Sequence, residues 1–430
     1  MLKAGFARVD VTPPLGSYIS GYYKARYAKG VLDPIELNAL AVSDGTVIGL
    51  IIISDFIGVD RKYCEIIRRK IMERTGVDGT HIMLSALHQH TSVCIDEMDQ
   101  YTPNDHIYME SLYRKYCDVA QMALADMKDA ELCFDSAETA KPIAFIRRYV
   151  MKDGTVATNP FNREHEIDHM YEPADNTVRL LRFKREGAND IAFVNFCTHP
   201  DVIGGEYLSA DWPGFVRRYV EQDLTDVSCM LLNGVQGDSN HIDFINNNKP
   251  KSYEHSSYMG RMIADVVLKL WDRAPSCPVE KLACGMTVVF NKTRTDEEEK
   301  YDEAVKFLED YRADRLQGHV TGADLGRATR ITKIRTSPIY QQIPVTVMKL
   351  GGFAFVGFGG EPFTHYATAV REACPDVTVI SSCLCNGDEG YLPTKNAFAE
   401  GGYEANSSPF SPNLEEDCVA AAVKLINELK

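Results

Sequence analysis

The sequence has no long hydrophobic run and no excess of positive charge. Its longest strongly apolar stretch, residues 47–53, is far shorter than the roughly 18 residues that a helix needs to cross a bilayer. Lysine and arginine number 46 against 61 aspartate and glutamate residues, which gives a net charge of −15. Nucleic acids and anionic membranes attract basic surfaces, so this balance argues against both as partners.

The sequence also lacks paired cysteine motifs and a recognisable leader peptide. Its twelve cysteines are scattered, and the one close pair, Cys383 and Cys385, has no second pair to accompany it. The first residues lead directly into a strand-like segment rather than into the apolar centre of a signal peptide. Scattered cysteines in a chain without an export signal are typical of reduced thiols, so we expect a cytoplasmic protein.

Apolar periodicity predicts an α/β fold in which layered, mixed β-sheets are flanked by helices. Asp44-Gly45 between two apolar runs is a strong hairpin signal, and strand–helix–strand order over residues 47–87 indicates a locally parallel sheet. The predicted strands are residues 7–12, 37–42, 47–53, 81–87, 131–138, 142–150, 177–183, 191–196, 230–232, 281–291, 345–350, 353–358 and 377–381. The predicted helices are residues 60–75, 105–128, 253–272, 295–315 and 413–428, with others beginning at Asp211 and Pro362.

The remaining segments are expected to be loops within a single domain of residues 1–430. The polar stretch 153–174 is predicted to be a surface loop, and residues 386–408 are predicted to be irregular. Residues 295–330 form the most polar region and are expected to be a helical insertion, beginning with a capping box at Thr295-x-x-Glu298.

Two histidines, His88 and His90, follow the apolar run in MLSALHQHTS at residues 83–92. If the run continues as a strand, its period of two places both side chains on one face. Such a pair has two explanations. Either the imidazoles are hydrogen-bonded near the end of a sheet, or they belong to a metal site, because neutral imidazole is the commonest metal ligand at neutral pH.

Other polar groups recur in the same local setting. His199, Asp238 and Glu361 each follow an apolar run and precede a loop that contains glycine or proline. In a layered fold, sites lie on loops at strand ends, held by a rigid sheet. Two or three histidines with one carboxylate and an open position are the usual composition of a catalytic zinc site. The sequence therefore predicts a hydrolytic rather than a structural zinc.

The sequence resembles the catalytic N-terminal domain of the neutral/alkaline, non-lysosomal ceramidase family, in the form of its smaller bacterial relatives. The matching motifs run nearly end to end in the family's order: T-P-P-x-G, S-A-L-H-Q-H-T-S, F-I-R-R-Y, T-H-P-D, S-A-D-W-P-G, G-x-x-G-D, G-G-E-P-F-T and G-Y-L-P-T through G-G-Y-E. The resemblance implies the layered ceramidase catalytic-domain fold, here without the C-terminal immunoglobulin-like domain of the larger ceramidases.

The resemblance also implies a set of zinc ligands. Carried over onto this sequence, they are His88, His199, Glu361 and Tyr403 of the G-G-Y-E motif. Tyr391 lies in the same segment and is the competing choice for the tyrosine ligand. We assign Tyr391 instead to the substrate carbonyl.

The catalytic residues show one departure from the family. His90 is similar to the family's catalytic histidine and Arg147 to its active-site arginine, but the serine motif G-D-V-S-P-N is altered. Asn240 stands in the place of the serine, and Ser239 lies one residue early, where the side chain points elsewhere. A metal-activated water, with His90 or Asp238 as general base, is therefore the expected nucleophile, and Ser239 remains a candidate.

Several other polar residues are expected to have structural roles. The acidic and histidine-rich residues 164–169 lie in a polar loop and are expected to be solvated. Asp211 is expected to cap a helix, whereas Asp55 is a candidate hydrogen-bond partner of a ligating histidine. His241 follows the Gly-Asp turn and either lines the pocket or supports the turn.

These features predict a zinc-dependent hydrolase that cleaves an amide (N-acyl) or ester bond in a small-molecule substrate other than ceramide. The alternatives are a metal-dependent enzyme that is not a hydrolase, such as a lyase, an isomerase or a carbohydrate-active enzyme, and a non-catalytic binding protein on the same fold. No phosphate-loop spacing is present, so no nucleotide is expected.

Overall fold

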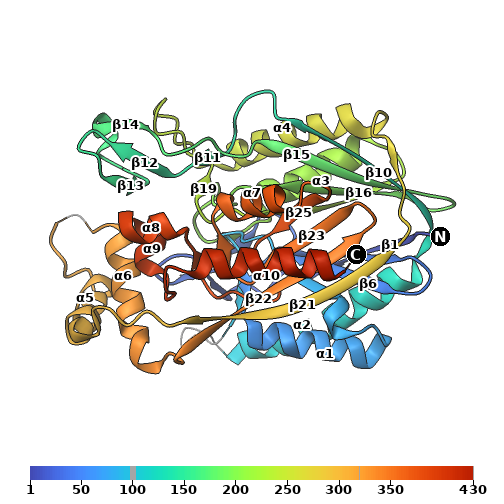
Figure 1. The fold of residues 1–430 in the computed structure, drawn as a ribbon. Coiled ribbons are helices and arrows are strands. Elements are labelled where there is room, and N and C mark those ends of the chain that lie inside the picture. Colours follow the sequence, from blue (N-terminus) through green and yellow to red (C-terminus); the bar gives the residue numbers. More distant parts are fainter. Residues whose placement is uncertain (97–102, 319, 430) are drawn as a thin grey trace.

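The computed structural model describes residues 1–96, 103–318 and 320–429. Two sheets pack against each other, and helices cover their outer faces (Figure 1). Aromatic pairs from the two sheets meet in the layer between them: Phe134 contacts Phe353 with ring centroids 5.0 Å apart, and Phe193 contacts Phe355 at 5.4 Å. The result is the predicted mixed α/β architecture with layered sheets.

The larger sheet has nine strands and is mostly antiparallel. The pairs β6/β8 and β16/β18, at its two ends, are parallel. In spatial order its strands are β18 (Val227–Asn233), β16 (Asp190–Phe196), β15 (Thr177–Arg185), β10 (Lys128–Glu138), β1 (Lys3–Asp10), β5 (Glu36–Ser43), β6 (Ile48–Ser54) and β8 (Ile82–Ala86), with β20 (Ser276–Cys277) beside β10.

The smaller sheet has four strands, and its last pair is parallel. Its strands in spatial order are β21 (Leu282–Lys292), β22 (Tyr340–Leu350), β23 (Phe353–Phe358) and β25 (Thr378–Ser382). Helices α7 (Thr364–Ala373) and α10 (Leu414–Glu428) pack on its outer face, and Figure 1 shows α10 in front of β21 and β22. Their apolar residues form one core with the smaller sheet.

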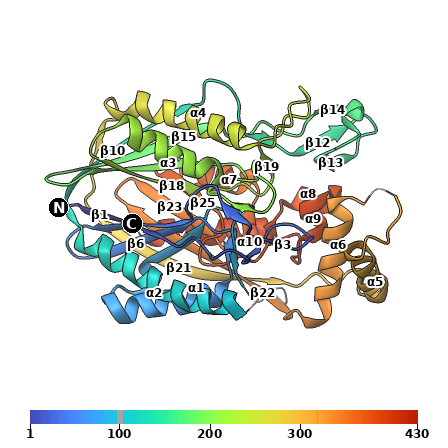
Figure 2. The same cartoon turned by 180° about the vertical axis from the view of Figure 1, so that it is seen from behind.

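Four helices cover the larger sheet. None of the described helices is long and apolar enough to cross a membrane. Helix α2 (Pro103–Ala125) lies over β1 and β5, with α1 (Arg61–Thr75) packed beside it. Helices α3 (Asp211–Asp223) and α4 (Tyr253–Trp271) lie over the β15–β18 end (Figure 2). Each pair buries apolar side chains against its own part of the sheet.

The two edge strands of the larger sheet meet at one point, and this closure places the site. Asn233 ends β18, and its Nδ2 donates to the carbonyls of Leu87 (3.0 Å) and Thr198 (3.2 Å). The smaller sheet joins at the same point, because Ser85 Oγ lies 2.9 Å from Ser382 Oγ. The chain segments that follow β8, β16 and β23 therefore run into one region.

Smaller elements surround this region. The short strand pairs are β2 (Tyr18–Ile19) with β3 (Arg26–Tyr27), β4 (Gly30–Val31) with β17 (Tyr207–Leu208), β7 (Gly58–Val59) with β9 (Cys94–Ile95), β11 (Phe145–Ile146) with β19 (Ser239–Asn240), and β24 (Glu361–Pro362) with β26 (Tyr391–Leu392). A three-stranded sheet holds β12 (Arg148–Met151), β13 (Val156–Thr158) and β14 (Ile167–Met170). The short helices are α5 (Tyr301–Arg312), α6 (Gly322–Lys333), α8 (Lys395–Glu400) and α9 (Tyr403–Ser407).

Most predicted elements are confirmed within a few residues, and three local predictions are wrong. The stretch 153–174 is not a loop, because it contains β13 and β14. Residues 386–408 contain β26, α8 and α9 rather than only irregular chain. No capping box begins at Thr295; the capping box in this region is formed by Thr321 and Asp324 at the start of α6.

Gly5 is expected to be essential for the packing of α2 against β1. A Cβ at this position would lie 2.1 Å from the carbonyl oxygen of Ala123 and 2.7 Å from the amide nitrogen of Met127. Both are backbone atoms, so Gly5→Ala should lower the free energy of unfolding by about 1–3 kcal/mol. Urea denaturation measures this loss. Gly79→Ala, where nothing lies within 4 Å of the new Cβ, is the control and should change stability little.

Candidate metal centre

His88 is held in an unusual backbone conformation just beyond β8. Its φ of 76° lies in the left-handed region, which costs a residue other than glycine about 1–3 kcal/mol. The strand has already ended at Ala86, so strand alternation does not place His88 and His90, although the two side chains do lie together, with ring centroids 4.9 Å apart. The His88 amide donates to the carbonyl of Phe56 (2.9 Å), and its Nδ1 lies 2.7 Å from the carbonyl of Ile57. These contacts orient Nε2 away from the main chain.

His199 is oriented in the same way from the opposite edge of the sheet. It follows β16, and its Nδ1 lies 2.8 Å from the carbonyl of Gln236 and 2.9 Å from that of Ser239. Since carbonyl oxygens only accept hydrogen bonds, Nδ1 of each histidine carries a proton. The Nε2 atoms of His88 and His199 are then available as ligands.

Glu361 brings a carboxylate to both histidines. Its Oε2 lies 3.2 Å from Nε2 of His88 and 3.0 Å from Nε2 of His199. All three side chains are more than nine-tenths buried. The β24 backbone packs closely here: a Cβ on Gly237 would lie 2.3 Å from the carbonyl oxygen of Glu361, so only glycine fits at that position.

The charges at this point fit a cation. Burial lowers the pKa of His199 to about 4, helped by the positive charge of Arg147, so its Nε2 is unprotonated at neutral pH. Burial raises the pKa of Glu361, but His88, His199 and Arg147 outweigh burial and lower it to about 2. An ionised carboxylate oxygen and two imidazole nitrogens thus converge at about 3 Å, an arrangement that a bound cation stabilises. Two imidazole nitrogens and one carboxylate oxygen suit zinc.

His90 lies beside this group without joining its hydrogen bonds. One potential ligand atom from each of His88, His90 and His199 lies within 4.8 Å of the others, so His90 is a further possible ligand. Neither of its ring nitrogens has a hydrogen-bond partner among the described residues. Burial lowers the pKa of His90 to about 3, against the opposing charge of Asp201. His90 is therefore a neutral base at neutral pH.

Arg147 and two tyrosines form one wall of the site. The Arg147 Nη2 donates to the carbonyl of Gly237 (2.6 Å), and its Nε lies 2.7 Å from Oε1 of Glu404. Burial lowers the pKa of Arg147, but Tyr391 and Glu404 more than offset this and raise it. The guanidinium carbon lies 5.3 Å from the ring centre of Tyr391 and 5.9 Å from that of Tyr403. The wall is thus positively charged and rich in hydroxyl groups.

The two tyrosines differ in their distance from the candidate ligands. Tyr391 pairs with Glu361 in the β24/β26 register, and its hydroxyl lies 3.5 Å from Nε2 of His199. The hydroxyl of Tyr403 lies 3.5 Å from that of Tyr23, on the side of the helical insertion. The assignment of Tyr403 as the ligand stays a prediction, and the geometry favours Tyr391.

The Gly-Asp turn that follows β18 supports neighbouring elements. Oδ1 of Asp238 accepts hydrogen bonds from both the amide and the hydroxyl of Thr364 (2.8 Å each), at the start of α7. Burial raises the pKa of Asp238 to about 6 despite these bonds. Ser239 Oγ is buried without a hydrogen-bond partner, and Asn240, in the family serine's place, is bonded to Asn159 at 3.0 Å.

The remaining sequence candidates lie outside the histidine group. His165 and His169 are exposed, so their expected solvated position is confirmed, although His169 lies in β14 rather than in a loop. The expectation that Asp55 supports a histidine is wrong, because it forms a two-pronged ion pair with Arg217 at 2.8 and 2.6 Å. His241 has its Nε2 2.8 Å from the carbonyl of Pro250. Asp211 accepts hydrogen bonds from three backbone amides as the first residue of α3.

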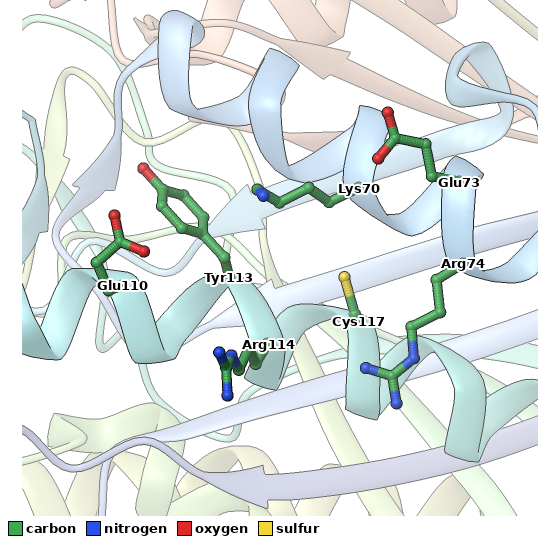
Figure 3. Close-up of a pocket in the computed structure, with 7 residues that line it drawn as sticks. All are labelled: Lys70, Glu73, Arg74, Glu110, Tyr113, Arg114 and Cys117. Atoms are coloured by element: carbon green, nitrogen blue, oxygen red, sulfur yellow. The ribbon is translucent and has the colours of Figure 1, made fainter.

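A separate surface groove lies between α1 and α2 (Figure 3). Its volume is about 460 Å³, and none of its lining residues belongs to the histidine group. Arg74 lies 2.8 Å from Asp118, and the Lys70 ammonium lies 5.6 Å from the ring centre of Tyr113. The groove therefore has no chemistry that would link it to the site.

The fold, unlike the sequence, has known counterparts. No protein-family model matches the chain, and no curated protein sequence matches it either. Two solved structures superpose on all of it with a TM-score of 0.73 and 14% identity. One is neutral ceramidase from Pseudomonas aeruginosa, of which 75% is covered, and the other is a ceramidase complexed with C2, of which 76% is covered. Along its whole described length, this chain therefore has the fold of neutral ceramidase.

Proposed function

We propose that this protein is a zinc-dependent hydrolase that cleaves an amide (N-acyl) or ester bond of a small molecule. The observation that carries the proposal is the approach of Glu361 Oε2 to the Nε2 atoms of both His88 and His199, at 3.2 and 3.0 Å. Their Nδ1 atoms are already bonded to main-chain carbonyls, so two imidazole Nε2 atoms and one carboxylate oxygen are the atoms that converge at the site. The ceramidase fold supports hydrolysis as the reaction class.

His88, His199 and Glu361 would hold the metal, with Tyr391 next to them. Zinc in this position would supply Lewis acidity, which lowers the pKa of water to about 7 and polarises a carbonyl. His90 accepts the proton of the attacking water, and we prefer it to Asp238 because Asp238 is bonded to Thr364. Because water is the nucleophile in this proposal, Ser239 is not required.

Arg147 stabilises the oxygen on which negative charge develops. Arg147 is buried and positively charged, and its pKa is raised, so it keeps its charge throughout the reaction. A preorganised donor that faces a developing oxyanion contributes about 10²–10³ in rate. The charged wall therefore acts on the carbonyl side of the scissile bond.

The proposed substrate is a small N-acyl compound other than ceramide, acted on in the cytoplasm. Ceramide is disfavoured because Asn240 replaces the nucleophilic serine. The Asn240 side chain donates a hydrogen bond to Asn159 and, among the described residues, forms none with the candidate ligands. A cytoplasmic location is supported by the cysteines, since all twelve are free thiols.

Metal analysis with a substrate panel tests this proposal. Protein purified without chelators should carry close to one equivalent of zinc and should hydrolyse at least one member of a panel of N-acyl amino acids, N-acyl amino sugars and simple esters. Less than a tenth of an equivalent of zinc, after preparation with zinc in the medium, would refute the site. Full zinc occupancy with no turnover on the panel would favour a lyase, an isomerase or a binding protein.

A pair of tyrosine variants should identify the fourth ligand. Because the Tyr391 hydroxyl lies 3.5 Å from Nε2 of His199, Tyr391→Phe is expected to weaken zinc binding by about 10–100-fold. Tyr403→Phe, whose hydroxyl contacts Tyr23, should leave zinc affinity within a factor of about three. Competition with a zinc chelator measures both affinities. The reverse pattern would establish Tyr403 as the ligand.

A further inference from the structure

Asp201 is the carboxylate nearest to a ring nitrogen of His90. Its Oδ1 lies 4.0 Å from Nδ1 of His90, and the Nδ1 edge of the ring also faces Gly21. Other acids near the site have their own partners: Glu404 pairs with Arg147, and Asp238 with Thr364. Asp201 therefore has a position that none of the predicted site residues fills.

The Asp201 carboxylate is held by two further side chains. The hydroxyl of Tyr22 donates a hydrogen bond to Oδ1, and Nζ of Lys251 lies 3.5 Å from Oδ2. Two donors from different segments fix the plane of the carboxylate. Both contacts keep the half-buried carboxylate on the Nδ1 side of the His90 ring, with Oδ1 4.0 Å from Nδ1.

Arg26 contacts both the ring of Tyr22 and the backbone of His90. Its guanidinium carbon lies 4.1 Å from the ring centre of Tyr22, and its Nη2 donates to the carbonyl oxygens of His90 (2.8 Å) and Ser20 (2.7 Å). Gly21 permits this close approach: its φ is 102°, and a Cβ there would lie 2.8 Å from Nδ1 of His90. The loop that carries Tyr22 is thus built against the histidine.

We propose that Asp201, held by Tyr22 and Lys251, is a positioning residue that accepts the Nδ1 proton of His90 and leaves Nε2 free as the base. This inference rests on the proposed hydrolase function and assigns a role to residues outside the ligand set. A carboxylate in this position fixes the tautomer and the ring orientation of a catalytic histidine.

The proton movements balance within this arrangement. Nε2 of His90 takes one proton from water as the water oxygen bonds to the carbonyl carbon. The imidazolium then carries protons on both nitrogens, and Asp201 stabilises its charge. His90 returns the proton to the leaving nitrogen or oxygen as the scissile bond breaks, so no other reactant is consumed.

Nuclear magnetic resonance of the His90 imidazole tests the positioning role without any substrate. In zinc-loaded protein labelled with ¹⁵N-histidine, His90→Gln identifies the His90 signals, which should show the Nδ1–H tautomer. Asp201→Asn presents an amide donor to Nδ1 and should shift His90 to the Nε2–H tautomer. Glu206→Gln, a carboxylate paired with Lys29 on the surface nearby, is the matched control and should leave the tautomer unchanged.

Kinetics on a substrate identified by the panel give the second measurement. Asp201→Asn should lower kcat by about 10²–10³-fold with KM within about threefold and zinc retained, and Asp201→Glu should recover part of the loss. Tyr22→Phe, which removes only the hydroxyl that donates to Asp201, should lower kcat by about tenfold.

The outcomes separate this inference from the proposed function. An unchanged His90 tautomer in Asp201→Asn, or an equal loss of activity with a large rise in KM, would overturn the positioning role even in an active enzyme. If the tautomer shifts as expected in protein that turns over no member of the panel, the hydrolase proposal fails and the Asp201–His90 contact stands.

Discussion

Glu361→Gln is expected to remove zinc from the protein and to abolish hydrolysis. The carboxylate supplies the one negative charge of the ligand set, so its loss should weaken zinc binding by at least about 100-fold. Lewis acidity is worth several kcal/mol of transition-state stabilisation, so kcat/KM should fall by about 10³-fold or more. Zinc content by mass spectrometry and turnover on the panel substrate are the measurements.

The variant should nevertheless fold well, which makes the result interpretable. The glutamine amide can donate hydrogen bonds to Nε2 of His88 or His199, whereas the carboxylate can only accept. The metal-free variant is therefore expected to be at least as stable to urea as metal-free wild type. Glu389→Gln is the matched control: this carboxylate lies in the segment just before Tyr391, contacts Arg61 at 3.4 Å, and should not affect zinc.

A different outcome would relocate the metal rather than remove it. If Glu361→Gln retains one equivalent of zinc with wild-type affinity, the ligands would be the three histidines whose candidate atoms lie within 4.8 Å of one another. His90 would then be a ligand, and its role as a base would be excluded. Zinc content of His90→Ala in the same background would distinguish these two arrangements.

Local sequence signals predicted the elements that depend on local interactions. The Asp44-Gly45 hairpin and helix α1 were predictable because turn residues, an N-terminal Asp60 and a C-terminal Gly76 mark their ends. Residues 153–174 were not predictable in this way. Strands β13 and β14 are short and only partly buried, and they form by pairing with β12.

The sequence indicated each candidate ligand separately, but it did not show that these residues lie close together. Each candidate ligand follows an apolar strand, which is visible in the sequence. His88 and His199 come together because the edges of a nine-stranded sheet are joined through Asn233, a contact between distant segments that leaves no local signal. The left-handed conformation of His88 is likewise imposed by tertiary contacts.

The choice between the tyrosines depended on the same kind of information. Only the β24/β26 pairing shows that Tyr391, and not Tyr403, lies beside Glu361. Asp201 and Glu404 end the T-H-P-D and G-G-Y-E motifs, but neither was assigned a role. The sequence does not show that Glu404 is buried beside Arg147 or that Asp201 lies near His90.

The second large effect is expected at Glu404. This carboxylate is fully buried, lies 2.7 Å from Nε of Arg147 and accepts a hydrogen bond from Thr158 Oγ1 at 2.7 Å. Glu404→Ala leaves the Arg147 guanidinium buried with its charge uncompensated. We expect the free energy of unfolding to fall by about 3–5 kcal/mol. Urea denaturation at neutral pH measures the loss, and turnover should fall with it because Arg147 is no longer held against Tyr391.

A double replacement separates the structural role of the pair from its role in catalysis. Arg147→Met combined with Glu404→Leu removes both charges, so it should cost much less stability than Glu404→Ala alone. Turnover should still be lost, because no guanidinium remains to face the developing oxyanion. Glu416→Gln, which breaks an exposed pair with Lys395, should have no measurable effect on stability.

The comparison of the single and double variants decides why the pair exists. If the double variant is stable but inactive, the buried charge is retained for catalysis, since an apolar pair would serve the fold equally well. If Glu404→Ala is as stable as wild type, the carbonyl of Gly237 and the ring of Tyr391 suffice to stabilise the Arg147 charge. Glu404 would then have no role in holding the guanidinium, and the wall of the site would depend on Arg147 and Tyr391 alone.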